Sequence, residues 1–370
     1  MKICLAKIIR CILFLFPSFF IKKNKVLFVS YSGAKFTCNP ATIYKKLINS
    51  NKKYECIIVK NNNDDKNTKS ITVKYKNIKF YYQYMTSKIL ITNDAFPLFL
   101  PKLKKQVLIN TWHGGGAYKK VDPITEQQVQ EYNLLYRDID YFISSNRKFS
   151  QVMSHALNIE KNKFLNIGMP RNDIFFDKNL IQKEQKKIKK EYSLDNEILI
   201  LYAPTWRDDG RNIVENLTDI HILEALRRKF NKKVKFMLRA HYHTKLLKSE
   251  AMIDVSDYPD MQELLCAADI LITDYSSCMW DFSLMYKPCF IFATDIDKYK
   301  QERDFYTPMS KWPFPIASNN EELVNNILNF NEAEYIEKVK KHHKALGSYE
   351  DGHACERVCK LIEEICKAAI

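Results

Sequence analysis

The feature that most constrains the fold is a series of short, continuously apolar runs separated by stretches with helical periodicity. In the first half of the chain these runs lie at 25–30, 54–59, 88–93, 106–111 and 141–146. Runs rich in β-branched and aromatic residues are typical of strands buried on both faces, which occur where helices connect parallel strands. The sequence therefore predicts an α/β domain built on a parallel sheet.

A second series of the same kind follows a lysine-rich helix predicted at about 179–192. Its apolar runs lie at 197–204, 234–243, 269–277 and 288–295, with helical patterns at 216–230 and 261–268. A chain of 370 residues is longer than one hydrophobic core usually grows. We therefore expect two doubly wound domains, 25–190 and 191–370, and a last helix from about Asp351 that can fold back toward the first domain.

Ligands of doubly wound domains bind outside the carboxyl ends of the strands. We therefore expect any chemistry in the loops that follow the strands, facing a cleft between the two domains.

The net charge of +15, from 58 basic and 43 acidic residues, favours an anionic partner. Nucleic acid, an anionic membrane and a phosphorylated substrate all fit this charge. The lysines are scattered along polar faces, as at 183–192, and no known nucleic-acid module is present. Solvated helix faces therefore explain them better, and we expect no nucleic-acid partner.

The ten cysteines lie mostly inside apolar runs, as Cys56, Cys266, Cys278 and Cys289 do, and form no CxxC pair. This pattern predicts reduced, buried thiols of a cytoplasmic protein and no structural metal. The polar run 60–70 is the only stretch that suggests a mobile loop.

The N-terminal segment 1–24 combines an apolar run, Cys11 to Ile21, with flanking lysines and arginine. Eleven residues are too few to span a bilayer as a helix, which takes about 20. No small-residue cleavage site of a signal peptide follows the run. We expect an amphipathic segment on an anionic membrane surface, with a buried first helix as the alternative.

The segment 268–292 is predicted to form a buried strand, a turn, a short helix and a further strand. Ser276 and Ser277 fall where the helix begins, shortly after Asp274. Their hydroxyls, the free backbone N–H groups and the helix dipole predict a phosphate or pyrophosphate site. The alternative is that Ser276 only caps the helix and that Asp281 completes the capping arrangement.

Two other stretches end strands of the same domain. Arg239 and His241 follow one strand, where a guanidinium can bind phosphate oxygens and a histidine can stabilise charge on a departing phosphate. Thr205 and Arg207 follow another strand and can add a hydroxyl and a positive charge. A surface turn that begins at a proline is the competing explanation for the second stretch.

The sequence TWHGGG, 111–116, ends a strand of the first domain. Although the chain has only 8 glycines, Gly114, Gly115 and Gly116 stand together directly after His113. Glycines let another molecule approach the backbone, and Lys119 adds positive charge. Because an unperturbed histidine titrates near neutrality, His113 can accept a proton from an attacking hydroxyl. A purely structural turn is the alternative, and no partner carboxylate for His113 is evident.

Taken together, seven stretches in order along most of the chain resemble the CDP-glycerol glycerophosphotransferase family, which primes and polymerises teichoic acids and related capsule polymers. They are 32–47, TWHGGGAYKK, SSN, GMPRND, LYAPTWR, RAH and 258–288. The resemblance implies a GT-B-like architecture of two Rossmann-like domains, a peripheral position on the cytoplasmic face of a bacterial membrane, and no required metal or cofactor.

The implied reaction is a phosphotransfer. A hydroxyl of a lipid-linked saccharide or growing polymer attacks the β-phosphorus of CDP-glycerol, or of another CDP-polyol such as CDP-ribitol, and CMP leaves. By motif, His113 resembles the base, and Arg239 and His241 resemble the pair that handles the diphosphate. Ser276 and Ser277 resemble the phosphate-binding turn.

The chain also departs from the family pattern. The first motif usually reads HGT followed by proline, where this chain has Gly115 and Gly116, and Tyr242 replaces a proline after the second histidine. These departures leave the polyol and the acceptor open. Two other classes compete: a GT-B glycosyltransferase that uses a nucleotide sugar, and a non-catalytic or nucleic-acid-binding protein.

Overall fold

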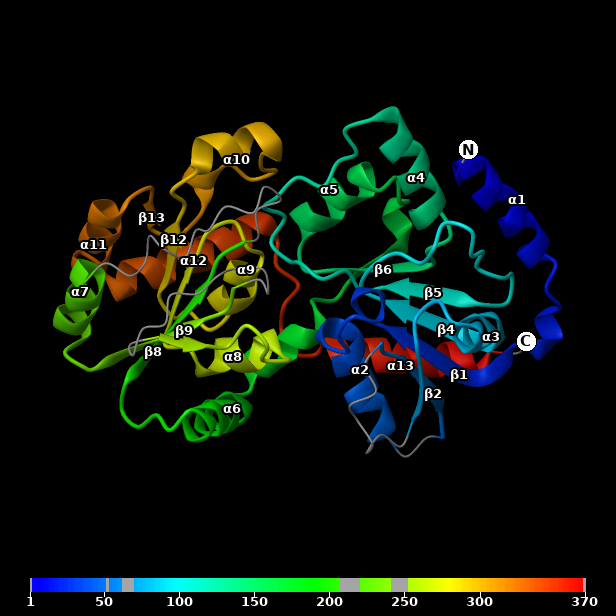
Figure 1. The fold of residues 1–370 in the computed structure, drawn as a ribbon, viewed down its shortest axis with the longest axis horizontal. Coiled ribbons are helices and arrows are strands. Elements are labelled where there is room, and N and C mark those ends of the chain that lie inside the picture. The colour runs from blue at the N-terminus through cyan, green and yellow to red at the C-terminus, as the bar shows by residue number, and fades with distance from the viewer. Residues whose placement is uncertain (1, 51–52, 62–69, 206–219, 241–251, 369–370) are drawn as a thin grey trace. The chain divides into compact units, whose positions relative to one another are not determined.

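The computed structural model describes residues 2–50, 53–61, 70–205, 220–240 and 252–368, in two compact units (Figure 1). Unit 1 comprises Met1–His113, Val121–Asp173 and Tyr349–Ile370, and unit 2 comprises Gly114–Lys120 and Ile174–Ser348. The chain therefore passes from one unit to the other after His113, Lys120, Asp173 and Ser348.

Unit 1 is built on a seven-stranded sheet in the order β3-β2-β1-β4-β5-β6-β7, and every pairing is parallel. Its strands are β1 (Lys22–Val29), β2 (Glu55–Val59), β3 (Ile71–Val73), β4 (Ser87–Thr92), β5 (Val107–Asn110), β6 (Tyr141–Ser144) and β7 (Phe164–Asn166). All six residues of β4 are buried, as expected for a strand covered on both faces. This confirms the predicted parallel α/β architecture.

Among its described residues, the α-helices of unit 1 are α1 (Lys2–Phe14), α2 (Cys38–Ile48), α3 (Ile78–Thr86), α4 (Glu126–Tyr136), α5 (Arg147–Ala156) and α13 (Ala354–Lys367). The helix α13 comes from the other end of the chain and lies beside α2 (Figure 1), where the Cys355 thiol donates to the Thr42 carbonyl oxygen over 3.6 Å.

The returning chain is fixed to unit 1 by two carboxylates. Asp173 accepts hydrogen bonds from the backbone N–H groups of Ala354, at 3.0 Å, and Cys355, at 2.7 Å. Glu350 accepts from the backbone N–H of Met169 at 3.0 Å and from the Asn172 amide at 3.1 Å. The GMPRND stretch thus holds the start of α13 in place.

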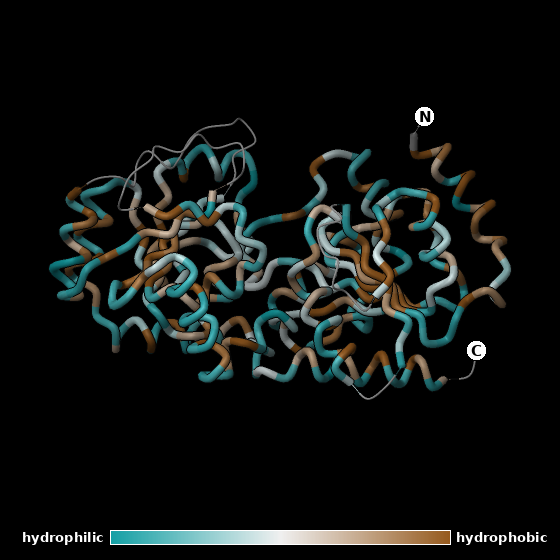
Figure 2. The backbone as a smooth tube through the Cα atoms, turned by 60° about the horizontal axis from the view of Figure 1, so that its bottom comes forward, coloured by the Kyte–Doolittle hydropathy of each residue, from teal (hydrophilic) through white to brown (hydrophobic). Residues whose placement is uncertain are grey.

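Unit 2 has a six-stranded sheet in the order β10-β9-β8-β11-β12-β13, again with parallel pairings only. Its strands are β8 (Ile198–Ala203), β9 (Val234–Leu238), β10 (Met252–Asp254), β11 (Ile270–Thr273), β12 (Cys289–Phe292) and β13 (Ile316–Ala317). Its helices are α6 (Lys178–Glu191), α7 (Ile220–Phe230), α8 (Met261–Ala267), α9 (Cys278–Ser283), α10 (Ile296–Glu302), α11 (Asn320–Leu328) and α12 (Glu332–Leu346). The strands form the hydrophobic centre of each unit, as Figure 2 shows by their brown colour.

Three sequence expectations concern smaller features. Cys56, Cys266, Cys278 and Cys289 are buried free thiols, as predicted. The polar run 60–70 falls largely outside the described residues, which exclude 62–69. Over the described part of the chain, no helix combines the length and apolarity needed to cross a membrane.

Candidate active site

The loop that carries His113 is shaped by hydrogen bonds at the carboxyl end of β5. The Thr111 N–H donates to the Thr92 carbonyl at 2.7 Å, so this part of the loop stays attached to β4. The Asn39 amide, at the start of α2, donates to the carbonyl oxygens of Thr111 at 3.0 Å and Trp112 at 3.1 Å. The neighbouring Trp112 has a positive φ of 50°, and the turn leaves His113 exposed.

The His113 ring is oriented by a backbone carbonyl. Its Nδ1 lies 2.8 Å from the carbonyl oxygen of Asn93, which follows β4. Because a carbonyl oxygen can only accept, Nδ1 carries a proton, and in the neutral ring the lone pair is then on Nε2. The ring also stacks on Trp112, with centroids 4.9 Å apart and planes 18° apart. His113 thus has the tautomer that a general base acting through Nε2 requires.

Asn93 is itself held in place. It is fully buried, and its side-chain oxygen accepts from the backbone N–H of Tyr31 at 2.8 Å. The ring of Tyr31 lies 5.8 Å from that of His113. The sequence offered no signal for Asn93, because the group it contributes to His113 is a backbone carbonyl.

The segment Gly114–Lys120, here called the glycine strap, belongs to unit 2. Sequence reasoning treats it as a loop of the first domain whose glycines admit a ligand. In the structure a protein side chain occupies that space: a Cβ on Gly115 would lie 2.4 Å from Cδ1 of Trp280. Gly116 has a φ of 82°, a conformation that favours glycine, and its Cβ would meet the Tyr118 ring at 2.2 Å. Gly115 and Gly116 are therefore required by packing within unit 2.

The rest of the strap is held to another loop of unit 2 by hydrogen bonds and an ion pair. The Tyr306 N–H donates to the Tyr118 carbonyl at 2.7 Å, and Lys119 forms a β-bridge with Phe305. Lys120 makes an ion pair with Asp304 at 2.5 Å. The Lys120 charge is thus balanced within unit 2.

The predicted phosphate-binding turn follows β11. Asp274 is buried, and its Oδ1 accepts from the backbone N–H groups of Thr205, at 2.8 Å, and Tyr275, at 2.5 Å. This carboxylate therefore joins the loops after β8 and β11, which are neighbouring strands. Because Oδ1 accepts these two backbone hydrogen bonds, Asp274 shapes the turn that carries Ser276 and Ser277.

The two serines are partly exposed at the start of α9. Ser277 stands at the N-cap and makes no side-chain capping hydrogen bond, while the Ser276 hydroxyl accepts from the Cys278 N–H only at 3.4 Å. Asp281 accepts from the Gln262 amide at 3.1 Å. Simple capping therefore accounts poorly for Ser277, and its hydroxyl suits a ligand.

Arg239 stands directly after β9, the other neighbour of β8. Its guanidinium donates to the Tyr258 carbonyl at 3.0 Å, which fixes the side chain near the carboxyl end of the sheet. Arg239, Thr205 and the Ser276–Ser277 turn thus follow three adjacent strands. His241 and Arg207, the remaining predicted site residues of this domain, lie outside the described residues, as does Tyr242. Among the residues that are described, no group of three or more His, Cys, Asp or Glu side chains suits a metal ion.

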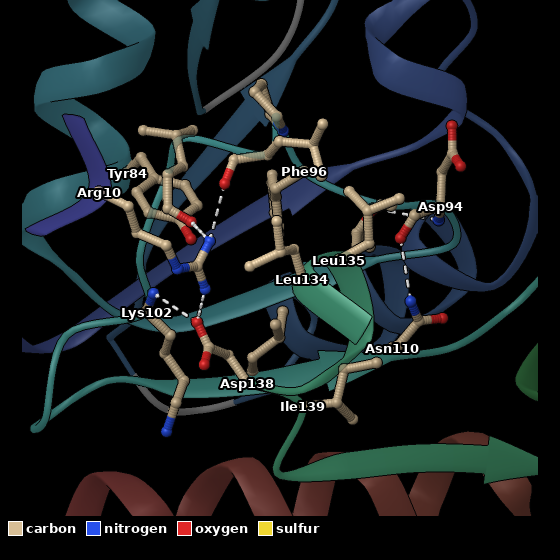
Figure 3. Close-up of a pocket in the computed structure, with 16 residues that line it drawn as sticks. Arg10, Tyr84, Asp94, Phe96, Lys102, Asn110, Leu134, Leu135, Asp138 and Ile139 are labelled. Carbon is tan, nitrogen blue, oxygen red and sulfur yellow. Dashed lines mark hydrogen bonds and ion pairs between the residues drawn. The ribbon is translucent and has the colours of Figure 1, made fainter. Parts of the chain in front are cut away.

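The N-terminal helix α1 is attached to unit 1 through a buried arginine. Arg10 donates to the carbonyl oxygens of Leu98, at 3.0 Å, and Leu100, at 2.6 Å, and makes an ion pair with Asp138. Figure 3 shows its guanidinium pointing toward Asp138. The helix and the turn after it expose large apolar side chains: Leu5, Ile8, Ile12, Phe14, Leu15, Phe19 and Phe20. Brown stretches mark this exposed segment in Figure 2.

Comparisons with known proteins agree on one family. The model of the family described as CDP-Glycerol:Poly(glycerophosphate) glycerophosphotransferase matches residues 11–364. The chain is 30% identical to the teichoic acid glycerol-phosphate transferase of Staphylococcus aureus (strain NCTC 8325 / PS 47), covering 92% of this chain and 93% of that protein. It is also 30% identical to the teichoic acid poly(glycerol phosphate) polymerase of Staphylococcus epidermidis, over 93% of this chain but only 51% of that longer protein.

A solved structure of the wall teichoic acid polymerase TagF superimposes with a TM-score of 0.84 at 28% identity, covering 97% of this chain and 93% of that one. The fold is therefore GT-B-like, and the protein is an enzyme of the transferase class. The chain belongs to the CDP-glycerol:poly(glycerophosphate) glycerophosphotransferase family.

Proposed function

We propose that this protein transfers glycerol phosphate from CDP-glycerol to a hydroxyl of a teichoic acid or related surface glycan and releases CMP. Membership of the family supports the donor and the class of acceptor. The observation that carries the mechanism is the 2.8 Å hydrogen bond between Nδ1 of His113 and the Asn93 carbonyl. It leaves Nε2 as the basic nitrogen of an exposed histidine.

In the proposed reaction His113 acts on the acceptor. Nε2 takes the proton from the acceptor hydroxyl as its oxygen attacks the β-phosphorus of CDP-glycerol. The new P–O bond joins glycerol phosphate to the acceptor, and the bond from this phosphorus to the bridging oxygen breaks. CMP carries away that oxygen and its electron pair.

The donor phosphates are assigned to unit 2. Ser276 and Ser277 would donate hydroxyl hydrogen bonds, and Arg239 would supply a planar cationic donor, in loops after adjacent strands. Thr205 lies in one of these loops, where its backbone N–H donates to the Asp274 carboxylate, and it would add a hydroxyl to the same phosphate site. By motif resemblance, His241 would stabilise charge on the departing CMP, and Arg207 would add to the positive field.

We further propose that no metal or other cofactor takes part, because cationic and hydrogen-bonding side chains would stabilise the phosphate charge. Full turnover in the presence of EDTA, compared with turnover after added Mg²⁺, tests this point. A requirement for Mg²⁺ would contradict it.

We also propose that the protein binds peripherally to the cytoplasmic face of a bacterial membrane, where a lipid-linked acceptor resides. The exposed apolar side chains of α1 support this, together with the exposed Lys7, Lys22 and Lys23 near them in sequence. Such a combination of apolar and basic side chains is typical of helices that lie in a membrane interface.

Identification of the released nucleotide tests the proposed function. The purified protein would be incubated in detergent with CDP-glycerol, CDP-ribitol or a panel of nucleotide sugars, plus a lipid-linked saccharide acceptor. CMP released only from a CDP-polyol supports phosphotransfer and identifies the polyol. A nucleoside diphosphate released from a nucleotide sugar would instead establish a glycosyltransferase. Retention on DNA with a steep salt dependence, without turnover of any donor, would favour a nucleic-acid-binding protein.

A further inference from the structure

An exposed tyrosine stands beside the proposed base in unit 1. The ring centroids of Tyr31 and His113 are 5.8 Å apart, with their planes inclined at 56°, and Tyr31 is 37% exposed. Both residues belong to unit 1. We propose that the Tyr31 ring binds the acceptor: the C–H face of its terminal sugar or polyol unit packs on this ring while its hydroxyl reaches His113. The inference rests on the proposed function and on the role of His113 in it.

The protein already contacts two sides of the His113 ring. Nδ1 is bonded to the Asn93 carbonyl, and the Trp112 ring stacks on the imidazole with centroids 4.9 Å apart. An acceptor hydroxyl that donates its proton to Nε2 approaches past these two contacts. A sugar or polyol unit bonded there is wide enough to bridge the 5.8 Å between the centroids of His113 and Tyr31. The position of the base thus brings the acceptor to the tyrosine ring.

The backbone at Tyr31 has a conformation that tyrosine rarely adopts. Tyr31 has a φ of 46° and Ser32 a φ of 51°, both in the left-handed region. This conformation is unfavourable for any residue with a Cβ, and residues held in it cluster at ligand sites. Glycine would be the least strained choice at either position. The turn therefore presents a large aromatic side chain where local backbone preference disfavours one.

The loop after β4 holds both the tyrosine and the base. The side-chain oxygen of Asn93 accepts from the Tyr31 N–H at 2.8 Å, and the backbone carbonyl of the same residue lies 2.8 Å from Nδ1 of His113. The next residue, Asp94, accepts from the Ser32 hydroxyl at 3.1 Å. Asn93 is fully buried. Contacts within unit 1 therefore set the distance between the tyrosine ring and the base.

A tyrosine ring suits the acceptor that the proposed function requires. Sugar and polyol units carry C–H groups that pack on aromatic faces, and tyrosine supplies this contact area at a low cost in conformational entropy. The phosphates of the donor instead require cationic and hydrogen-bonding groups, which the loops of unit 2 would supply. We therefore expect Tyr31 to determine the affinity for the acceptor and to have little effect on the affinity for CDP-glycerol.

Steady-state kinetics of CMP release separate the two substrates. Tyr31→Asn removes the ring but tolerates a left-handed φ, so it should raise KM for the acceptor about tenfold and change KM for CDP-glycerol by less than about twofold. Tyr31→Phe keeps the ring, and its acceptor KM should stay within about threefold of the wild-type value. A disaccharide with a short alkyl chain and a glycerol phosphate dimer are tested separately. The probe whose KM responds identifies the unit that packs on the ring.

Tyr286 offers a matched control in unit 2. It is also 37% exposed, it has a φ of 58°, and its ring lies 6.2 Å from that of a histidine, His343. It precedes β12 and so stands near the amino end of that strand. Tyr286→Asn should leave both KM values close to those of the wild type. An equal rise in acceptor KM in Tyr31→Asn and Tyr286→Asn would contradict the inference, because loss of any exposed ring would then explain the result.

A second measurement detects the contact without turnover. In deuterated protein with protonated tyrosines, saturation of the tyrosine ring signals should transfer to the C–H groups of the bound acceptor probe. This transfer should be lost in Tyr31→Asn and retained in Tyr286→Asn. If the wild-type protein released no CMP, the proposed function would fail, whereas transfer that depends on Tyr31 would still support the inference. Equal transfer in the wild type and Tyr31→Asn would overturn it.

The kinetic results can also overturn the inference. A wild-type acceptor KM in folded Tyr31→Asn would exclude the contact, as would an acceptor KM in Tyr31→Phe as high as that in Tyr31→Asn. If Tyr31→Asn does not fold, Tyr31→Gly replaces it, because glycine readily adopts a φ of 46°, and the same rise is expected. Equal rises in KM for acceptor and donor would show that the turn shapes the site as a whole and does not bind the acceptor.

Discussion

Tyr118 and His342 face each other inside unit 2, with the Tyr118 hydroxyl 3.0 Å from Nε2 of His342 and the two ring planes only 2° apart. The adjacent His343 pairs with Ser283 at 2.7 Å. Burial lowers the pKa of both His342 and His343 to about 4, and a hydrogen bond to the Lys311 backbone offsets this only in part for His342. Both rings are therefore neutral in the folded protein at neutral pH.

These two histidines predict an acid-sensitive fold. An unfolded chain binds protons at histidine below a pH of about 6.5, whereas the folded state resists until about pH 4. The free energy of unfolding therefore has its full value above about pH 6.5. It falls as the pH drops toward 4, by up to about 1.4 kcal/mol per pH unit for each histidine, because only the unfolded chain binds the protons. Urea unfolding at pH 7 and pH 5 measures this loss. His342→Gln should reduce the dependence of the free energy of unfolding on pH, whereas His353→Gln, at an exposed position, should leave it unchanged.

Replacement of the proposed base should affect the chemistry alone. His113→Gln keeps a hydrogen-bonding side chain of similar size but cannot take the proton, so we expect kcat for CMP release to fall by at least about 100-fold. His113 is exposed, so the thermal midpoint should stay near the wild-type value. His353→Gln serves as the control. Substantial turnover by His113→Gln would rule out the assignment of His113 as the base.

Two serines near α9 should respond in opposite ways to replacement by alanine. Ser277 makes no capping hydrogen bond, so Ser277→Ala should leave stability within about 0.5 kcal/mol and raise KM for CDP-glycerol about tenfold or more. Ser283→Ala removes the partner of His343, so it should lose about 1–3 kcal/mol of stability with an unchanged KM. Initial-rate kinetics and urea unfolding of both variants check this, and a reversed pattern would exclude Ser277 as a phosphate ligand.

Asp173 should stabilise the start of α13. Its carboxylate accepts from two N–H groups there, so Asp173→Ala should cost about 0.5–2 kcal/mol of the free energy of unfolding. Asp173→Asn retains an acceptor and should cost less. Amide hydrogen exchange at Ala354 and Cys355 should accelerate in the alanine variant, and unchanged exchange would show that the cap is unimportant.

A charge on the exposed face of α1 should weaken membrane binding. Ile8 is 59% exposed, and its transfer into a lipid interface would be worth about 1.5–3 kcal/mol. Ile8→Glu should therefore lower partitioning onto anionic phospholipid vesicles by about tenfold or more. Ile220→Glu places the same charge at a 52%-exposed isoleucine of α7 and should have little effect. Equal loss in both variants would point to net charge alone.

Much of the fold could be predicted because burial imposes continuous apolar runs on central strands. The runs at 54–59, 88–93 and 197–204 correspond to β2, β4 and β8 within one or two residues. The short strands β3, β7, β10 and β13 were not predicted. Each has only two or three residues and stands at or next to a sheet edge, so few of its side chains must be apolar.

The candidate site was predicted less completely. Chemically distinctive side chains such as His113, Arg239 and Ser277 stand out in a sequence, and the structure places each in a loop directly after a strand or at the start of α9. The groups that contact the site residues do not stand out. The Asn93 carbonyl, which contacts His113, is a group that every residue has. Trp280, which packs against Gly115, cannot be told from any other core residue in the sequence. The glycine triplet was interpreted as space for a ligand because a sequence does not show what packs opposite it.

The order in which the chain visits the two units limits how the protein can be divided. Unit 1 is assembled from three separate stretches and unit 2 from two, so no single cut yields either unit whole. A fragment that stopped at Ser348 would lack α13 and would leave the Asp173 carboxylate without its N–H partners. A fragment that started at Ile174 would lack the strap, and the indole of Trp280 would lose the backbone that covers it. Neither unit is therefore expected to survive limited proteolysis as an independently folded piece.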